Sequence, residues 1–126
     1  SVYAMMETLE YLHRGGRIGK AQFLLGSLLK TCPILTFTDG VVEPVDRPRT
    51  RARGIRRLVE IVQNHAPLTS VSVLSSTDEE GALDLASRLV DIAPTGGPIM
   101  ARIGPTLGAH VGPGALGVAF ISERSP

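Results

Sequence analysis

Apolar residues recur at helical spacing in four stretches of the chain, separated by glycine, proline and hydroxyl residues. Side chains at i, i+3, i+4 and i+7 share one face of a helix, so this spacing favours amphipathic helices. The predicted helices span residues 2–13, 18–30, 49–65 and 77–93. Gly15-Gly16 ends the first helix and Pro33 stops the second, because both residue types terminate helices. Thr77 followed by Glu80 is typical of a capping box.

Shorter apolar stretches with other spacing predict strands. The predicted strands are Pro33–Phe37, Val41–Val45, Leu68–Ser75, Ile99–Ile103 and Leu116–Ile121. Asp39-Gly40, between the first two, favours a two-residue hairpin turn. Apolar and hydroxyl residues alternate over residues 68–75, as they do in a half-buried strand. Pro44 and Pro48 indicate that the second strand is short or lies at a sheet edge, because proline cannot donate to the ladder.

These elements predict an α/β (α+β) fold. The chain has 126 residues, enough for one ordinary domain, and 43% of them are hydrophobic. Helices and strands alternate in the second half, whereas a hairpin occurs early. We therefore expect a two-layer sandwich, in which helices cover one face of a mixed, mostly antiparallel sheet.

The formal net charge is only +1, but the positive charges are unevenly distributed. Six arginines fall within eleven residues: Arg47, Arg49, Arg51, Arg53, Arg56 and Arg57. A basic helix of this kind is compatible with an adaptor that binds nucleic acid or an acidic protein. The run lacks the interleaved aromatic residues that stack on bases. A solvated helix face is therefore the preferred interpretation, which predicts no nucleic-acid partner, and the adaptor is the alternative.

Other classes of chemistry find little support in the residue pattern. Cys32, the single cysteine, precedes Pro33 in an apolar run and is interpreted as a buried small hydrophobe. His13 and His65 stand alone at helix ends, and no Cys/His spacing predicts a metal site. No nucleophile–base pair or pair of carboxylates is evident, so a self-contained enzyme is not expected. No window is apolar over the 18 to 20 or so residues that a transmembrane helix needs.

The glycine-rich segment from Gly104 to Gly117 is the strongest candidate for a functional site. Five glycines and two prolines fall within the fourteen residues from Gly104 to Gly117, which indicates a loop that bends sharply and approaches something closely. Exposed backbone amides favour an anion, and His110 in the middle can donate a further hydrogen bond. The alternative is a tight connection between two strands with a solvent-exposed histidine. The ending of a Walker phosphate loop is missing.

The same segment carries a family resemblance. It reads Gly-Pro-x-x-Gly-x-His-x-Gly-Pro-Gly-Ala-Leu-Gly and resembles the C-terminal signature of the DegV family. The opening Leu9-Glu10-Tyr11-Leu12-x-Arg14-Gly15-Gly16-Arg17-Ile18 is similar to the start of that family's C-terminal domain. Between them, residues 28–35, Asp39-Gly40 and residues 44–51 follow the family's order and spacing.

The resemblance implies that residues 1–126 form the C-terminal lid domain of a two-domain protein, with the N-terminal domain absent from this chain. Such proteins bind one long-chain fatty acid between their two domains, and some present its carboxylate to a separate fatty acid kinase. The C-terminal domain contributes the histidine of the glycine loop, here His110, while the other domain contributes hydroxyl groups. The amides of Gly112 and Gly114 complete the predicted carboxylate site. The fatty acid is the expected ligand, and no cofactor or metal is expected.

Two further sets of residues are assigned on this basis. Arg17 follows the Gly15-Gly16 elbow and is predicted to lie near the carboxylate or the path of the phosphoryl donor, since guanidinium suits both anions. A solvated or helix-capping arginine is the alternative reading. The acyl chain is predicted to contact the helix after the elbow, although an ordinary core role competes for each side chain. The residues concerned are Ile18, Phe23, Leu24 and Leu28.

A lid without its partner domain should expose an apolar patch, so homodimerisation of the chain is expected. The single cysteine cannot form an internal disulfide, which fits a cytoplasmic location.

Overall fold

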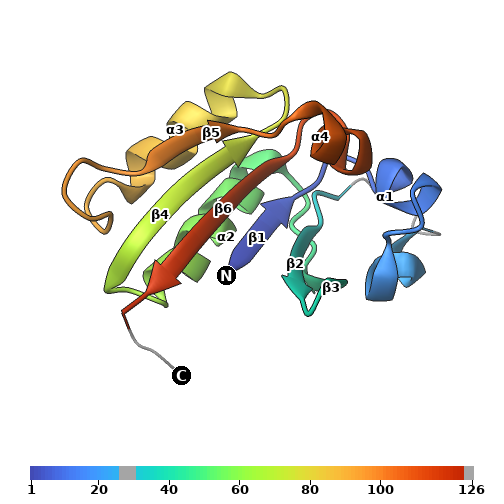
Figure 1. The fold of residues 1–126 in the computed structure, drawn as a ribbon, viewed down its shortest axis with the longest axis horizontal. Helices are drawn as coiled ribbons and strands as arrows, with labels where there is room; N and C mark the ends of the chain where they lie inside the picture. The colour runs from blue at the N-terminus through green and yellow to red at the C-terminus, as the bar shows by residue number, and fades with distance from the viewer. Residues whose placement is uncertain (26–30, 124–126) are drawn as a thin grey trace.

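The computed structural model describes residues 1–25 and 31–123, in which one sheet of six strands organises the fold (Figure 1). Its strand order is β3-β2-β1-β6-β4-β5. The strands are β1 (Val2–Met5), β2 (Ile34–Thr38), β3 (Val41–Asp46), β4 (Leu68–Ser75), β5 (Ile99–Arg102) and β6 (Leu116–Ser122). Only β4 and β5 pair in parallel, and the other neighbours are antiparallel. The predicted mixed, mostly antiparallel sheet is therefore confirmed.

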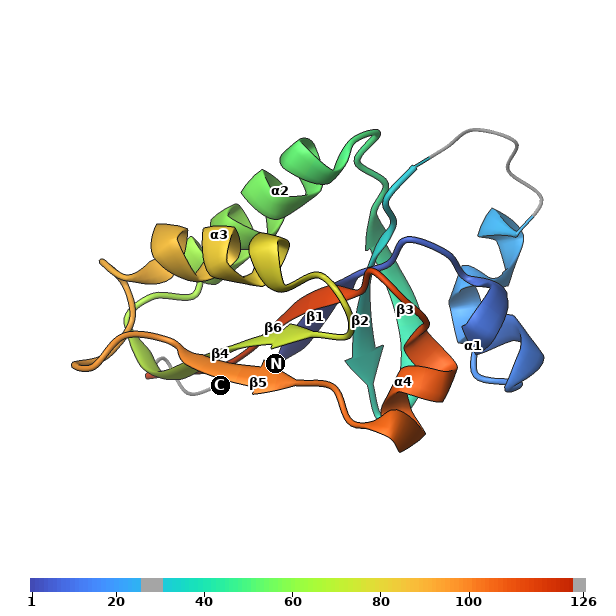
Figure 2. The same ribbon diagram turned by 90° about the horizontal axis from the view of Figure 1, so that it is seen from above.

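Two long helices cover one face of this sheet, as Figure 2 shows. They are α2 (Arg51–Gln63) and α3 (Glu79–Leu89). Leu58 of α2 and Leu85 of α3 are fully buried, and they pack with Val73 of β4 and Val118 of β6. These four belong to a larger buried group, which we call the first cluster. Its members are Met5, Ile34, Ile55, Leu58, Val59, Ile61, Val62, Leu68, Val71, Val73, Ala82, Leu85, Leu89, Leu116, Val118 and Phe120. Because its residues recur at helical and strand spacing, this layer follows directly from the sequence pattern.

Shorter helices cover part of the opposite face, at the β1–β3 end. They are α1 (Glu10–Arg14), the 3₁₀ helix η1 (Gly19–Leu24) and α4 (Pro105–Val111). Their buried side chains meet Leu35 of β2 in a second cluster, whereas the preceding Ile34 belongs to the first. Successive strand residues point to opposite faces, so the two clusters lie on either side of the sheet.

The first predicted helix is wrong in its N-terminal half. Val2–Met5 is a strand, β1, placed between β2 and β6, and only Glu10–Arg14 is helical. Met5 contributes to the first cluster and Ala4 to the second, so both faces of the strand are buried. Apolar residues on both faces produce a run that a helix with one apolar face matches equally well.

The second predicted helix is replaced, within the described part of the chain, by the six residues of η1. Gly19 has φ of +55° and packs against the backbone of Val42, so the chain turns into η1 at a point where no side chain fits. Residues 26–30, which include the predicted lining residue Leu28, lie outside the described residues.

Most of the remaining predictions hold. β2 and β3 form the predicted hairpin around Asp39-Gly40, and β3 lies at a sheet edge, as Pro44 indicated. The start of α3 differs from the prediction, because Asp78 is the N-cap and its carboxylate accepts from the Gly81 amide at 2.9 Å. The Thr77 hydroxyl instead accepts a hydrogen bond from the distant Gly114 amide.

Candidate functional site

The glycine-rich segment is not a bare loop, which corrects the sequence prediction. Pro105–Val111 forms helix α4, with Pro105 in its first turn, where a missing N–H costs nothing. Gly112, with φ of +79°, ends the helix. Glycine and proline therefore mark the two ends of a short helix here, and His110 lies in its last turn.

The His110 imidazole is half-buried and packs against the elbow after α1. A Cβ added to Gly15 would lie 2.7 Å from His110 Nδ1, so the ring fits only because Gly15 has no side chain. Arg17 is exposed and follows Gly15 by two residues, with its amide donating to Leu12 O at 2.8 Å. The fold thus brings the segments that carry His110 and Arg17 to the same corner.

The two glycine amides predicted to bind an anion already have partners within the chain. The Gly112 amide donates to Gly108 O at 2.9 Å, and the Gly114 amide donates to Thr77 Oγ1 at 2.8 Å. Neither is therefore a spare donor. Both glycines serve instead for close approach, because a Cβ at Gly112 would collide with the Tyr11 ring and one at Gly114 with the Glu7 carboxylate.

The predicted acyl-chain residues have separate locations. Ile18 and Leu24 are buried in the second cluster, which is the ordinary core role that competed with lipid contact. Phe23 is 68% exposed and lies outside both clusters. Of the three predicted residues that the structure describes, Leu24 alone also lines the first of the hollows in the surface.

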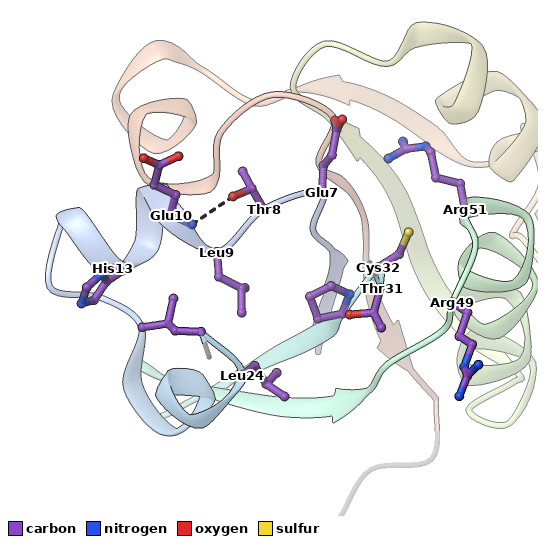
Figure 3. Close-up of a pocket in the computed structure, with 12 residues that line it drawn as sticks. Glu7, Thr8, Leu9, Glu10, His13, Leu24, Thr31, Cys32, Arg49 and Arg51 are labelled. Carbon is purple, nitrogen blue, oxygen red and sulfur yellow. Dashed lines mark hydrogen bonds between the residues drawn. The ribbon is translucent and has the colours of Figure 1, made fainter. Parts of the chain in front are cut away.

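That hollow has a volume of about 660 Å³ and lies between the start of α1, the end of η1 and the segment before β2 (Figure 3). Apolar atoms come from Leu9, Leu24 and Pro33. Charged groups, among them Glu7 and Arg51, lie at the side nearer α2. Its volume is within the range of roughly 300–1,000 Å³ that small-molecule sites occupy. Sequence reasoning missed this hollow, because its walls come from segments far apart in the chain.

A second hollow, of about 540 Å³, lies against α4, which does not line the first. Gly108 of α4 and Gly112, which caps that helix, line it together with Tyr11, Thr77 and Arg102. Gly108 and Gly112 are one helical turn apart and so share a face, whereas His110 points to a different side of the helix. His110 and Arg17 line neither of these two hollows.

The arginine run is partly tied down by ion pairs. Arg57 pairs with Asp46 and Glu60, and Arg51 pairs with Asp78. Arg51 also donates from Nη1 to Gly114 O at 2.9 Å. These two side chains are therefore committed within the fold, which leaves a smaller basic face than the sequence suggested.

Two titratable groups near this network are shifted. The Gly81 amide and the Arg51 guanidinium lower the pKa of the Asp78 carboxyl, and the amide has the larger effect. Burial raises the pKa of the Cys32 thiol, which is half-buried and packs against the first cluster. Cys32 therefore resembles the predicted small hydrophobe more than a reactive thiolate.

In residues 1–25 and 31–123, no three His, Cys, Asp or Glu side chains gather closely enough to hold a metal ion. Among the helices of the same ranges, none combines the length and the apolar character that crossing a membrane requires.

Comparisons with known proteins fit this fold and segment order. The family model described as "Uncharacterised protein, DegV family" matches residues 1–123, so the chain belongs to the DegV family. A DegV domain-containing protein of Streptomyces coelicolor is 41% identical over 128 residues, covering 98% of this chain and 45% of the relative. The chain thus spans about half the length of the curated relatives it matches.

Solved structures give the same result. A DegV family protein from Thermus thermophilus, described by its fatty acid binding, has a TM-score of 0.85 and 31% identity, covering 97% of this chain and 45% of that one. DegV of Bacillus subtilis, described as a fatty acid binding protein, has a TM-score of 0.77 and 33% identity, with 97% and 44% covered. The fold is therefore that of known DegV proteins.

Proposed function

We propose that this chain binds a long-chain fatty acid as the C-terminal lid domain of a two-domain DegV protein. The observation that carries the proposal is membership of the family along essentially the whole chain, together with relatives above 30% identity that are described as fatty acid binding. The chain covers 44–45% of those two proteins, which leaves room in each for a second domain.

His110 is the proposed donor to the fatty acid carboxylate. His110 lies in the last turn of α4 and is half-buried, and its ring packs against Gly15, so part of the residue stays accessible. An imidazole of this kind donates a hydrogen bond in either protonation state. Arg17, exposed at the same corner, is the proposed second donor to the carboxylate. A carboxylate buried beside an apolar chain needs such partners, because unpaired charge is costly to bury.

The acyl chain requires an apolar surface, and the described residues offer two. Leu9, Leu24 and Pro33 line the hollow of about 660 Å³. The sheet face opposite α2 and α3 carries Ile99 and Ile121, which are 61% and 60% exposed. Burying about sixteen carbons at about 0.8 kcal/mol per CH₂ gives roughly 10 kcal/mol before entropy costs, so either surface supplies a strong driving force.

Native mass spectrometry tests the proposal directly. The chain is expressed both alone and joined behind the N-terminal half of the Streptomyces coelicolor relative, and each protein is ionised after mild purification. We expect the joined form to carry one fatty acid of long chain length. If both forms are free of lipid, and added oleate does not bind either, the proposed function is wrong.

Presentation of the carboxylate to a fatty acid kinase is the finer part of the proposal. It predicts that the joined form presents bound oleate to a fatty acid kinase, which phosphorylates the oleate in a cytoplasmic reaction.

A separate prediction is that the chain alone self-associates through its uncovered sheet face. A single monomeric species in sedimentation velocity at high concentration contradicts the self-association.

A further inference from the structure

A set of hydrogen bonds holds the segment between α4 and β6 from two directions. The Gly114 amide donates to Thr77 Oγ1 at 2.8 Å, while the Gly114 carbonyl accepts from Arg51 Nη1 at 2.9 Å. The neighbouring Ala115 amide donates to Ser76 Oγ at 3.0 Å, and Ala115 O accepts from the Ser76 amide at 3.1 Å. We call these contacts the Gly114 clamp.

Arg51 is the part of the clamp that connects it to the rest of the fold. Its guanidinium pairs with Asp78, whose other oxygen caps α3 by accepting from the Gly81 amide. Arg51 itself is the first residue of α2. The Arg51 guanidinium thus links the starts of α2 and α3 to the Gly114 carbonyl. Lysine has a single terminal nitrogen and does not reproduce this planar arrangement of donors.

The segment between α4 and β6 depends on contacts with other elements, because its own residues do not fix its conformation. Gly112 and Gly114 both have positive φ, at +79° and +75°, and Pro113 separates them. Helix α4 has only seven residues, too few to be stable alone. Its orientation therefore depends on what holds its ends, and His110 lies one turn before Gly114.

We infer that Arg51 is a positioning residue for His110, acting through the Gly114 carbonyl, an inference that rests on the proposed role of His110 in binding a fatty acid carboxylate. Arg51 itself need not touch the ligand. Loss of the Arg51 side chain removes the hydrogen bond to Gly114 O. The segment between α4 and β6 is then less restrained, and the His110 imidazole can move away from Gly15.

A matched control lies on the same helix. Arg57 is as exposed as Arg51, at 35% against 34% of the side chain, and it also forms ion pairs, with Asp46 and Glu60. It makes no contact with the Gly114 clamp in the described structure. Arg57→Gln therefore reproduces the loss of a half-buried, ion-paired arginine without disturbing the clamp.

The test compares Arg51→Gln, Arg51→Lys and Arg57→Gln by NMR and by titration with oleate. In Arg51→Gln we expect faster exchange of the Gly114 amide and loss of the Overhauser contact between the His110 ring and Gly15. Oleate affinity should fall by at least about tenfold, the scale of one lost hydrogen bond to a charged group. Arg51→Lys should lie between Arg51→Gln and wild type, and Arg57→Gln should keep both the ring contact and the affinity.

If Arg51→Gln keeps the ring contact, or binds oleate as Arg57→Gln does, the inference is wrong. If Arg51→Gln does not fold, the hydrogen bond between the Gly114 amide and Thr77 is tested instead. Thr77→Val must then weaken the contact between the His110 ring and Gly15, whereas Thr77→Ser must keep it. An undisturbed ring in Thr77→Val then overturns the inference. The contact between the His110 ring and Gly15 is measured without lipid. If no form binds oleate, the proposed function is wrong, whereas the ring contact still decides whether Arg51 positions His110.

Discussion

The two sides of the sheet are stabilised in different ways. On one side, α2 and α3 have 13 and 11 residues and cover the first cluster, which contains most of the fully buried large side chains. On the other side, α1, η1 and α4 have only five, six and seven residues. Helices this short are not stable alone, so their positions depend on glycine contacts and on backbone hydrogen bonds to other segments. The candidate site around His110 lies on this second side, whose helices depend on contacts with other segments.

The largest expected loss of stability comes from the first cluster. Leu58→Ala removes a fully buried side chain from α2, and such truncations destabilise by about 2–5 kcal/mol through lost burial and a remaining cavity. Urea denaturation followed by circular dichroism measures the loss. Leu83→Ala on α3, where the side chain is 64% exposed, is the control and should change stability by less than about 0.5 kcal/mol. Equal losses in the two variants would contradict the assignment of the core.

A glycine should matter nearly as much on the second side. Gly112→Ala forces an alanine into a positive φ and brings its Cβ onto the Tyr11 ring, so we expect a loss of about 2 kcal/mol or more. Gly108→Ala is the control, because nothing lies within 4 Å of an added Cβ and alanine favours the helix by up to about 1 kcal/mol. If Gly112→Ala is as stable as wild type, α4 does not pack on α1 as described.

The difference between the two sides also explains how much the sequence could predict. The spacing of Ile55, Leu58 and Val62 gave α2, and the alternation over residues 68–75 gave β4, because each element buries one face. β1 was missed because both of its faces are buried, so its apolar residues do not alternate. α4 was missed because its glycine content suggested a loop, although Pro105 at its start is a recognisable helix signal.

The candidate site was predictable only in part. Family resemblance identified His110, and the structure places its ring against Gly15. The partners of the Gly114 backbone are Thr77 and Arg51, which lie 37 and 63 residues away in the chain. Nothing in local spacing reveals such contacts. The only local signal concerned Thr77, which directly precedes the N-cap of α3, because hydroxyl side chains near helix starts commonly bind backbone groups. Arg51 is the first residue of α2 and carried no such signal.

A smaller effect is expected from Asp78, which connects the two sides through Arg51. Its folded-state pKa is lowered, so its contribution to stability is present above the unfolded carboxyl pKa of about 3.9 and is lost as the pH falls through the lower folded value. Asp78→Asn keeps an acceptor for the Gly81 amide but removes the ion pair.

The free energy of unfolding of Asp78→Asn and wild type should therefore differ at neutral pH and converge in strong acid. The measurement is a series of denaturant titrations between about pH 7 and pH 2. Parallel stability curves for the two proteins over that range would show that Asp78 does not carry this linkage.

The smallest effect concerns Cys32, which packs against the first cluster but also lines the hollow beside the second. Burial raises the pKa of its thiol, so less thiolate is present at neutral pH than in an unfolded chain. Alkylation by iodoacetamide should be several-fold slower in the folded chain than in urea, and bound oleate should slow it further if the acyl chain enters the hollow. Alkylation as fast as that of the unfolded chain would contradict the burial.

The most direct test of the account is the oleate affinity of His110→Ala beside that of His13→Ala, in the form of the protein that binds lipid. His13 is exposed at the end of α1 and lines the hollow of about 660 Å³, whereas His110 does not. We expect a loss of about tenfold or more in His110→Ala, with unchanged folding, and little change in His13→Ala. Unchanged affinity in His110→Ala would contradict the central claim, and a loss confined to His13→Ala would move the carboxylate to the hollow.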